Sequence, residues 1–291
     1  MTEIPKIPFL KKENSEIEFE IIKLSTLFSR QSKLNYPLGK PHRVEFYHIV
    51  YFSKGSGVHF VDFQPYTYDE GSLLFISKGQ VHAFRVSPDA EGILILFTES
   101  FLSKNMIHSD ILSLHRLYNY HFRHPVILSE DSQNEKFSMV IHELSEEYKH
   151  PDAFAKEDML RLLLKLLLLK AERVKQTLLP QGKTTNRITK FTTFQQNVEA
   201  HYTETRNARD YADMMAVSYK TLNDICKSIT GSTAKAFIDN AVILEIKRHL
   251  ATSDISVKEL TYIMGFDEPT NFVKYFKKHT GQSPSKFQRQ V

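Results

Sequence analysis

The stretch GFDEPTNFVKYFKKHTGQSP, from Gly265 to Pro284, decides the fold of the last third of the chain. After a Gly-Phe pair, Phe272 and Phe276 follow four positions apart, which is the spacing of one helix face. We predict a helix from Glu268 to Thr280 with one apolar face for docking. The polar side chains fall on its other face: Thr270, Asn271, Lys274, Lys277 and Lys278.

The same pattern occurs twice, in residues 207–231 and 256–281. Asn207 can cap the first helix of one unit, and Ser256 with Glu259 forms a capping box at the start of the other. In both units a short helix with apolar spacing is followed by a break, a second helix and a glycine. We predict two helix-turn-helix motifs, whose second helices are the usual readers of the major groove.

The polar faces of the two second helices correspond. Lysine contacts phosphates, and asparagine and lysine read base edges. Any exposed helix face is polar, so one such face alone does not indicate DNA binding. Two polar faces on helices with matched spacing do indicate it. The predicted DNA contacts on the helix from Ser218 to Thr230 are Ser218, Tyr219, Lys220, Asn223, Asp224 and Lys227, joined by the five polar side chains of the later helix.

Charge supports a polyanionic partner for the C-terminal third. From Thr184 to the end there are 15 basic and 11 acidic residues, whereas the rest of the chain holds 23 of each sign, which places the whole net charge of +4 in this third. Such asymmetry is typical of a nucleic-acid-binding region. No Walker loop, GxGxxG or nucleophile motif is present, and Cys226 lies on the apolar face of its predicted helix, as a core residue would.

The N-terminal part reads as short strands separated by turn signals, such as VEFYHIVYF, KGSG, VHFVDF, QP and YTY between residues 44 and 68. Close, regular strands predict a β-barrel or sandwich. Two helices are then expected, from Ser132 to Lys149 and from Phe154 to Thr177. The second is apolar nearly all round, which suits burial against the barrel on one side and a second copy of the chain on the other. Its apolar run, from Leu160 to Leu169, is shorter than a membrane span requires and is interrupted by Arg161 and Lys165.

The chain resembles the AraC/XylS family of transcription regulators, most strongly over IMGFDEPTNFVKYFKKHTGQSPSKF, residues 263–287. Thr261, where the family often has alanine, and Gln288, where arginine is common, depart from its pattern. The resemblance implies an α+β protein: a cupin-like effector-sensing and dimerisation domain (1–178), a linker (179–186) and an all-helical DNA-binding domain (187–291). It also implies an activator that dimerises through 154–177 and works with RNA polymerase.

Four histidines fall in the predicted barrel. Gly71, Gly79 and His82 fit the second motif of metal-binding cupins, but the first motif fails, so a metal enzyme is the weaker alternative and we expect neither catalysis, metal nor cofactor. We expect instead a cavity for a small effector. A regulator controlled by a protein partner, with a solid barrel, is the other alternative. The candidate effector contacts are His42, Arg43, Glu45, Tyr47, His59, His82 and Phe84.

The two faces of the strand that carries Tyr47 cannot be assigned from the sequence. Val44, Phe46, His48 and Val50 alternate with Arg43, Glu45, Tyr47 and Ile49, and either set could face inward. The charged N-terminus lacks the apolar core of a signal peptide, and the single cysteine excludes an internal disulfide framework. We therefore expect a cytoplasmic protein.

Overall fold

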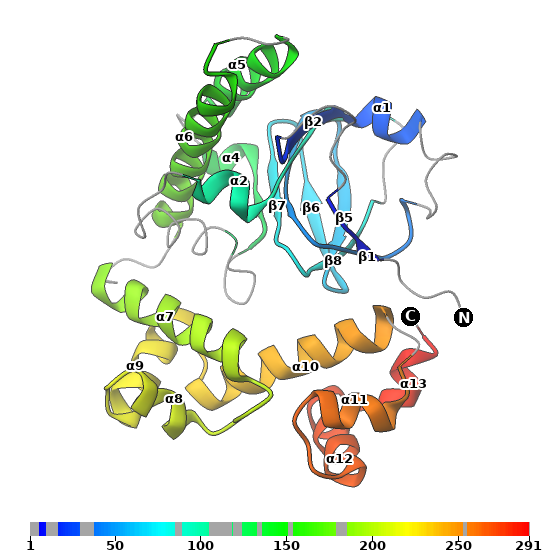
Figure 1. Ribbon diagram of the computed structural model, residues 1–291, viewed down its shortest axis with the longest axis vertical. Helices are drawn as coiled ribbons and strands as arrows, with labels where there is room; N and C mark the ends of the chain where they lie inside the picture. Colours follow the sequence, from blue (N-terminus) through cyan, green and yellow to red (C-terminus); the bar gives the residue numbers. More distant parts are fainter. Residues whose placement is uncertain are drawn as a thin grey trace. The chain divides into compact units, whose positions relative to one another are not determined.

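The computed structural model describes residues 6–9, 17–29, 38–84, 89–104, 118, 124–132, 136–150, 154–178, 185–252 and 255–290. They fall into two compact units, within residues 5–179 and 180–291. Figure 1 shows the first as strands flanked on one side by α5 and α6, and the second as helices throughout. The predicted α+β class is thereby confirmed. Nothing helical among the described residues has the length and apolar character that crossing a membrane requires.

The first unit contains two five-stranded sheets, with the strand orders β1-β3-β8-β5-β6 and β10-β7-β4-β9-β2. Two short helices, α1 (Leu24–Ser29) and α2 (Glu99–Ser103), follow β2 and β9. The strands are β1 (Lys6–Ile7), β2 (Phe19–Lys23), β3 (His42–Val44), β4 (Tyr47–Lys54), β5 (Gly57–Val61), β6 (Gln64–Tyr68), β7 (Leu73–Ile76), β8 (Val81–Ala83), β9 (Glu91–Phe97) and β10 (Val126–Ile127).

Two hydrophobic cores lie on opposite faces of the sheet that contains β4. Val50 and Phe52 belong to the core between the sheets, which we call the interior core. Tyr47 and Ile49 belong to a second core, shared with the helices α5 (Phe137–Lys149) and α6 (Lys156–Thr177). Successive side chains of a strand point to opposite faces. The open question about this strand is therefore settled: Val44, Phe46, His48 and Val50 form the inward set.

Three boundaries differ from the predicted ones. The strand expected over 44–52 is divided between β3 and β4, because the chain passes from one sheet to the other at Glu45 and Phe46. The helix expected from Ser132 is instead a short α4 (Ser129–Ser132) and then α5, with residues 133–135 outside the described part. The helix α6 begins at Lys156, after Ala155 in a left-handed conformation.

The second unit begins with α7 (Thr185–His201), so the last two residues of the predicted linker are helical, and residues 179–184 lie outside the described part. The first helix-turn-helix is formed by α8 (Ala208–Met214) and α9 (Tyr219–Thr230), and the second by α11 (Val257–Ile263) and α12 (Pro269–Thr280). Between them runs the long α10 (Ala234–Thr252), and α13 (Pro284–Gln288) ends the unit.

The turns of the two motifs have the same hydrogen-bonded form. The Val217 amide donates to the Ala212 carbonyl at 3.0 Å, and the Phe266 amide donates to the Thr261 carbonyl at 3.0 Å. The residues before them, Ala216 and Gly265, both have positive φ, of 50° and 68°. Ala212 and Thr261 are buried, as expected for close helix crossings. The internal repeat predicted from the sequence is therefore a repeat in three dimensions.

Gly265 is the position in this repeat that tolerates no side chain. A Cβ there would lie 1.6 Å from the Thr203 carbonyl oxygen, in addition to the left-handed φ. Gly281 has the same kind of φ, 76°, but a Cβ would meet nothing within 4 Å. Substitutions at the two glycines therefore distinguish the cost of a left-handed backbone, which both share, from the cost of steric overlap, which only Gly265 has.

We predict that Gly281→Ala destabilises the protein by the left-handed backbone cost alone, about 1–2 kcal/mol. Gly265→Ala adds the displacement of residue 203 and should cost more than about 3 kcal/mol, beyond the range of ordinary substitutions. Urea unfolding of both variants beside the parent chain measures the difference. Equal midpoints for the two variants would show that the contact with Thr203 is not a constraint.

Candidate DNA-binding surface and effector cavity

The helix α12 presents its predicted contact residues as one exposed face. Thr270, Asn271, Lys274, Lys277 and Lys278 are all exposed, whereas Phe272 and Phe276 are fully buried on the other side. Pro269 occupies the first turn, and Gly281 ends the helix in the left-handed conformation. The structure therefore brings these five side chains together as a polar, lysine-rich surface.

The helix α9 presents most, but not all, of its predicted contacts. Tyr219, Lys220, Asp224 and Lys227 are exposed. Ser218 is also exposed, but its hydroxyl accepts a hydrogen bond from the Thr221 amide at 3.1 Å and so caps the helix.

Asn223 has a structural role that the sequence did not reveal. It is half-buried, and its side-chain oxygen accepts a hydrogen bond from the Ala234 amide at 3.0 Å. Ala234 is the first residue of α10, whose N-terminal amides have no partner within the helix. Asn223 therefore caps α10. When the final glycines of the two motifs are aligned, Thr221 is the counterpart of Asn271, and this exposed residue was missed in the sequence analysis.

Arg206 lies two residues before α8 of the first motif and contacts the turn of the second motif. Its guanidinium donates to the carbonyls of Met264 and Gly265, at 2.9 and 2.8 Å, and lies 3.9 Å from the centre of the Phe266 ring. The next residue, Asn207, caps α8 by accepting from the Arg209 amide. One side chain thus connects the start of one motif to the turn of the other.

A second link joins α12 to α10. The Tyr275 hydroxyl donates to the Asp239 carboxylate at 2.7 Å, and Lys235 forms an ion pair with the same carboxylate. Burial and this carboxylate raise the pKa of Tyr275, which therefore stays a hydrogen-bond donor. Because Asn223 caps α10 as well, both recognition helices are anchored to α10.

The interior of the first unit brings together His42, His48, His59, His82 and Phe84. The His59 and His82 rings share a hydrogen bond of 3.1 Å, and His42 lies 4.1 Å from His82 between ring centres. The cluster contains the four histidines of strands β3, β4, β5 and β8. Among the described residues no group of three or more His, Cys, Asp or Glu side chains is placed to hold a metal ion.

Burial keeps these imidazoles neutral. Desolvation lowers the pKa of His42 to about 4 and that of His59 to about 3, and the nearby His42 reinforces the effect at His59. Desolvation likewise lowers the pKa of His48 and His82 well below the ordinary value. At neutral pH the cluster is therefore uncharged.

A cavity of about 170 Å³ adjoins this cluster in the interior core. His42, His48 and Phe84 line it, and the other lining side chains are mainly apolar. His48 is a residue that the sequence analysis did not select as an effector contact. Its alternation with Val44, Phe46 and Val50 was the available signal, but the sequence analysis left open which set of that strand faces inward.

Five of the seven predicted effector contacts do not line this cavity. His59 and His82 belong to the adjoining histidine cluster, and the other three lie elsewhere. Tyr47 points away from the cavity and stacks on Phe97 in the core shared with α5 and α6. Arg43 and Glu45 do not line the cavity, and their side chains approach each other at 3.7 Å. Each alternates with an inward-facing neighbour, which explains why it lies on the other face.

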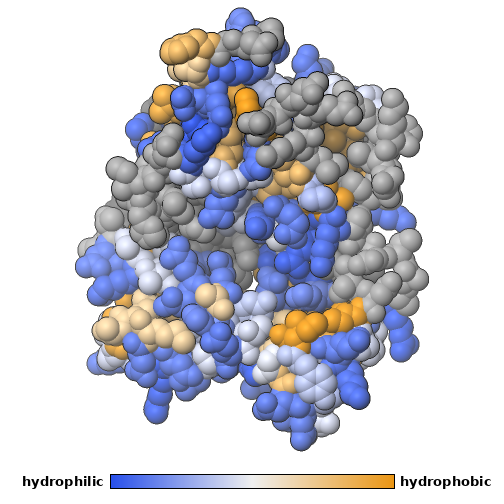
Figure 2. Space-filling view, viewed as in Figure 1, coloured by the Kyte–Doolittle hydropathy of each residue, from blue (hydrophilic) through white to orange (hydrophobic). Residues whose placement is uncertain are grey.

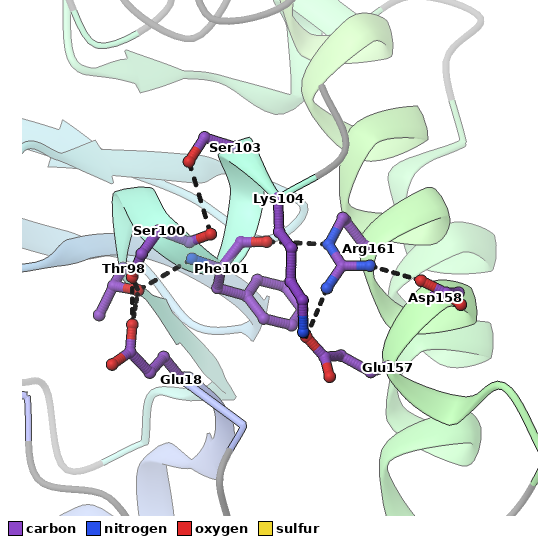
Figure 3. A network of polar contacts seen from close by, with 9 residues as sticks. All are labelled: Glu18, Thr98, Ser100, Phe101, Ser103, Lys104, Glu157, Asp158 and Arg161. Carbon is purple, nitrogen blue, oxygen red and sulfur yellow. Dashed lines mark hydrogen bonds and ion pairs between the residues drawn. The ribbon is translucent and has the colours of Figure 1, made fainter. Parts of the chain in front are cut away.

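The sheet that lines the cavity is also tied to α6. Figure 3 shows buried Arg161, on α6, donating to the Phe101 carbonyl of α2 at 2.9 Å and pairing with Asp158 at 2.6 Å. At the other end of α2, Thr98 caps the helix and donates to Glu18, next to β2, at 2.6 Å. The strands β2 and β9 are thus joined to α6 through α2.

Comparisons with known proteins cover both parts of the chain. The model of an AraC-like ligand binding domain matches residues 34–164, and that of a helix-turn-helix domain matches residues 211–290. The chain belongs to the AraC family of transcription regulators. Its two parts correspond to the ligand-binding and DNA-binding domains of that family, as the resemblance implied.

Relatives of the AraC family align over most of the chain. The HTH-type transcriptional activator RhaS of Yersinia pestis bv. Antiqua (strain Angola) is 26% identical over 256 residues, 86% of this chain and 89% of the relative. RhaS of Yersinia pseudotuberculosis serotype I (strain IP32953) is 26% identical over 263 residues, with the same coverage. Among solved structures, unsaturated-fatty-acid-bound ToxT of Vibrio cholerae strain SCE256 has a TM-score of 0.45 at 15% identity, covering 96% of this chain and 97% of ToxT.

Asn223 and Asn271 should respond differently to substitution. Asn223→Ala removes the cap of α10 and should destabilise the protein by about 1 kcal/mol. Asn223→Asp keeps the acceptor at a helix N-terminus and should restore most of that loss. Asn271→Ala, on an exposed face, should leave stability within about 0.5 kcal/mol. Thermal unfolding measures all three, and a stability loss at Asn271 equal to that at Asn223 would contradict the assignment.

Proposed function

We propose that this chain is a cytoplasmic transcription activator that binds DNA through α9 and α12 and is controlled by a small effector in the interior cavity. The observation that carries the proposal is the pair of structurally matched helix-turn-helix motifs, each with an exposed polar recognition helix. Both helices are anchored to α10, which supports insertion into DNA at a fixed separation. The RhaS relatives, which are named as transcriptional activators, support the sign of regulation. The proposed activator works with RNA polymerase.

The proposed DNA contacts divide into two kinds. Lys227, Lys274, Lys277 and Lys278 are exposed cations suited to phosphates. Asn271, with Thr270 beside it near the N-terminus of α12, is placed where recognition helices usually meet base edges. Asn223 is withdrawn from the base-reading group, because its side-chain oxygen caps α10.

Binding of the protein to its own upstream DNA and to scrambled DNA, followed by fluorescence anisotropy over a salt series, tests this division. Lys277→Ala should weaken binding to both DNAs alike and reduce the salt slope by about one. Asn271→Ala should weaken binding to the specific site by about 1–3 kcal/mol, and leave scrambled DNA unaffected. Equal losses on both DNAs for both variants would refute sequence reading by α12.

We propose that the protein forms a dimer through α6. The buried leucines of α6 pack into the core of the same unit. Four other side chains of α6 are exposed and follow the three- and four-residue spacing of a coiled-coil seam: Met159, Leu162, Leu166 and Leu169. Figure 2 shows hydrophobic side chains interrupting the hydrophilic surface over α5 and α6.

Charge at the ends of α6 favours an antiparallel pair. Asp158, which also pairs with Arg161, is exposed in the first turn, and Arg173 is exposed near the last. Antiparallel copies would bring these opposite charges near each other. The occupant that we propose for this face is therefore a second copy of the chain, with Leu162 of one copy near Leu169 of the other.

Leu166→Glu should convert the dimer to a monomer, because the charge would be buried at the centre of the seam. Met139→Glu is the matched control: Met139 is an exposed apolar residue of α5 outside the seam, and this variant should remain dimeric. Sedimentation velocity at micromolar concentration measures both. A dimeric Leu166→Glu variant, or a parent chain that is monomeric, would remove α6 as the interface.

A further inference from the structure

The size of the interior cavity indicates which molecules can lie within it. Its volume is about 170 Å³. An engineered protein cavity of about 150 Å³ with a similar apolar lining holds one benzene molecule. The cavity therefore accommodates a molecule about as large as a single substituted ring.

Most of the lining is apolar. Ile22, Phe46, Leu94 and Leu96 belong to or pack against the interior core, and Phe9 and Phe84 add aromatic rings. A bound molecule with many hydroxyl groups would leave several of them without partners, at about 1–3 kcal/mol each. The lining therefore disfavours a sugar and favours a molecule that is largely hydrocarbon.

His48 supplies the exception to this apolar lining. It is 4% exposed, it lines the cavity, and both of its ring nitrogens lack a hydrogen-bond partner. A neutral imidazole has one donor and one acceptor nitrogen. A buried polar group without a partner is costly in the absence of a ligand. Neither nitrogen is accessible to solvent, so a hydroxyl group in the cavity reaches one of them only after the imidazole ring rotates. It could then accept from one nitrogen or donate to the other, because it has both capacities.

Charge excludes an anionic effector. The described lining residues include no lysine or arginine, and they do include Glu20. The neighbouring histidines are neutral because burial lowers their pKa, so they offer no counter-ion to a carboxylate. A free carboxylate in this cavity would be desolvated without compensation.

We propose that the cavity selects a small uncharged alcohol of the size of phenol, with its ring among the apolar side chains and its hydroxyl bonded to His48. The proposal rests on the function proposed above only for the claim that such a ligand regulates DNA binding. The selectivity itself follows from volume, lining and the unpartnered imidazole.

Isothermal titration of the full-length protein with four probes tests the selectivity: phenol, toluene, benzoate and a hexose. Phenol should bind about five- to tenfold more tightly than toluene, the gain expected from one added hydrogen bond. Benzoate and the hexose should bind more weakly than toluene. Tighter binding of benzoate or the hexose, or no binding of phenol at millimolar concentration, would overturn the proposal.

Substitutions of His48 test whether the ligand binds beside this residue. His48→Leu should abolish the preference for phenol over toluene while keeping toluene affinity within about twofold, because shape is roughly conserved and the polar group is lost. His48→Gln, whose amide donates and accepts, should retain part of the preference. His142→Leu makes the same change at an exposed histidine of α5 and should behave like the parent. An unchanged preference in His48→Leu would refute the role of His48.

DNA anisotropy with and without phenol separates this proposal from the proposed function. Sequence-dependent DNA binding by a protein that binds none of the probes would overturn the ligand class and leave the regulator intact. Phenol binding that leaves DNA affinity unchanged would support the cavity chemistry and overturn its regulatory role. A change in DNA affinity that is lost in His48→Leu would support both.

Discussion

The contact between residues 203–206 and the turn of the second helix-turn-helix is the constraint on which the DNA-binding unit depends. The Thr203 carbonyl leaves no room for a side chain at Gly265, and Arg206 donates to two carbonyls of the same turn. Because α8 begins two residues after Arg206, this contact fixes one motif against the other. Two recognition helices bind DNA well only if their separation is fixed in advance. Helices that moved independently would have to be ordered on binding, and that ordering would cost binding free energy.

The helix α10 completes that constraint from the opposite side. Asn223 caps its first turn from α9, and Asp239 accepts from Tyr275 of α12. Both recognition helices thus contact α10 through polar groups that are directional, in addition to apolar packing that is not. Hydrophobic burial holds the helices together, and these few hydrogen bonds determine their rotation, which decides which side chains face outward.

The sequence predicted the helices and their repeat because spacing and caps are local properties. Ser256, Glu259 and Gly281 act within a few residues of where they stand, so their roles were readable. The capping role of Asn223 was not readable from the sequence because its partner, Ala234, belongs to another helix. An asparagine on a polar helix face looks the same in the sequence whether it caps a helix or contacts a base. Likewise, the inward face of β4 was undecidable because Ile49 and Val50 are both fully buried.

Burial of that sheet on both faces has a consequence for regulation. On β2 and β9, Ile22 and Leu96 line the cavity, while Phe19 and Phe97 pack into the core shared with α6. The cavity and α6 are therefore separated by the thickness of one sheet. Packed cores respond to displacement by repacking and not by gradual compression. A ligand that fits one arrangement of these strands better than another would select an arrangement of α6 as well. Arg161, bonded to α2 at the end of β9, ties the helix to the same strands. The proposed effector and the proposed dimer would then share one structural element.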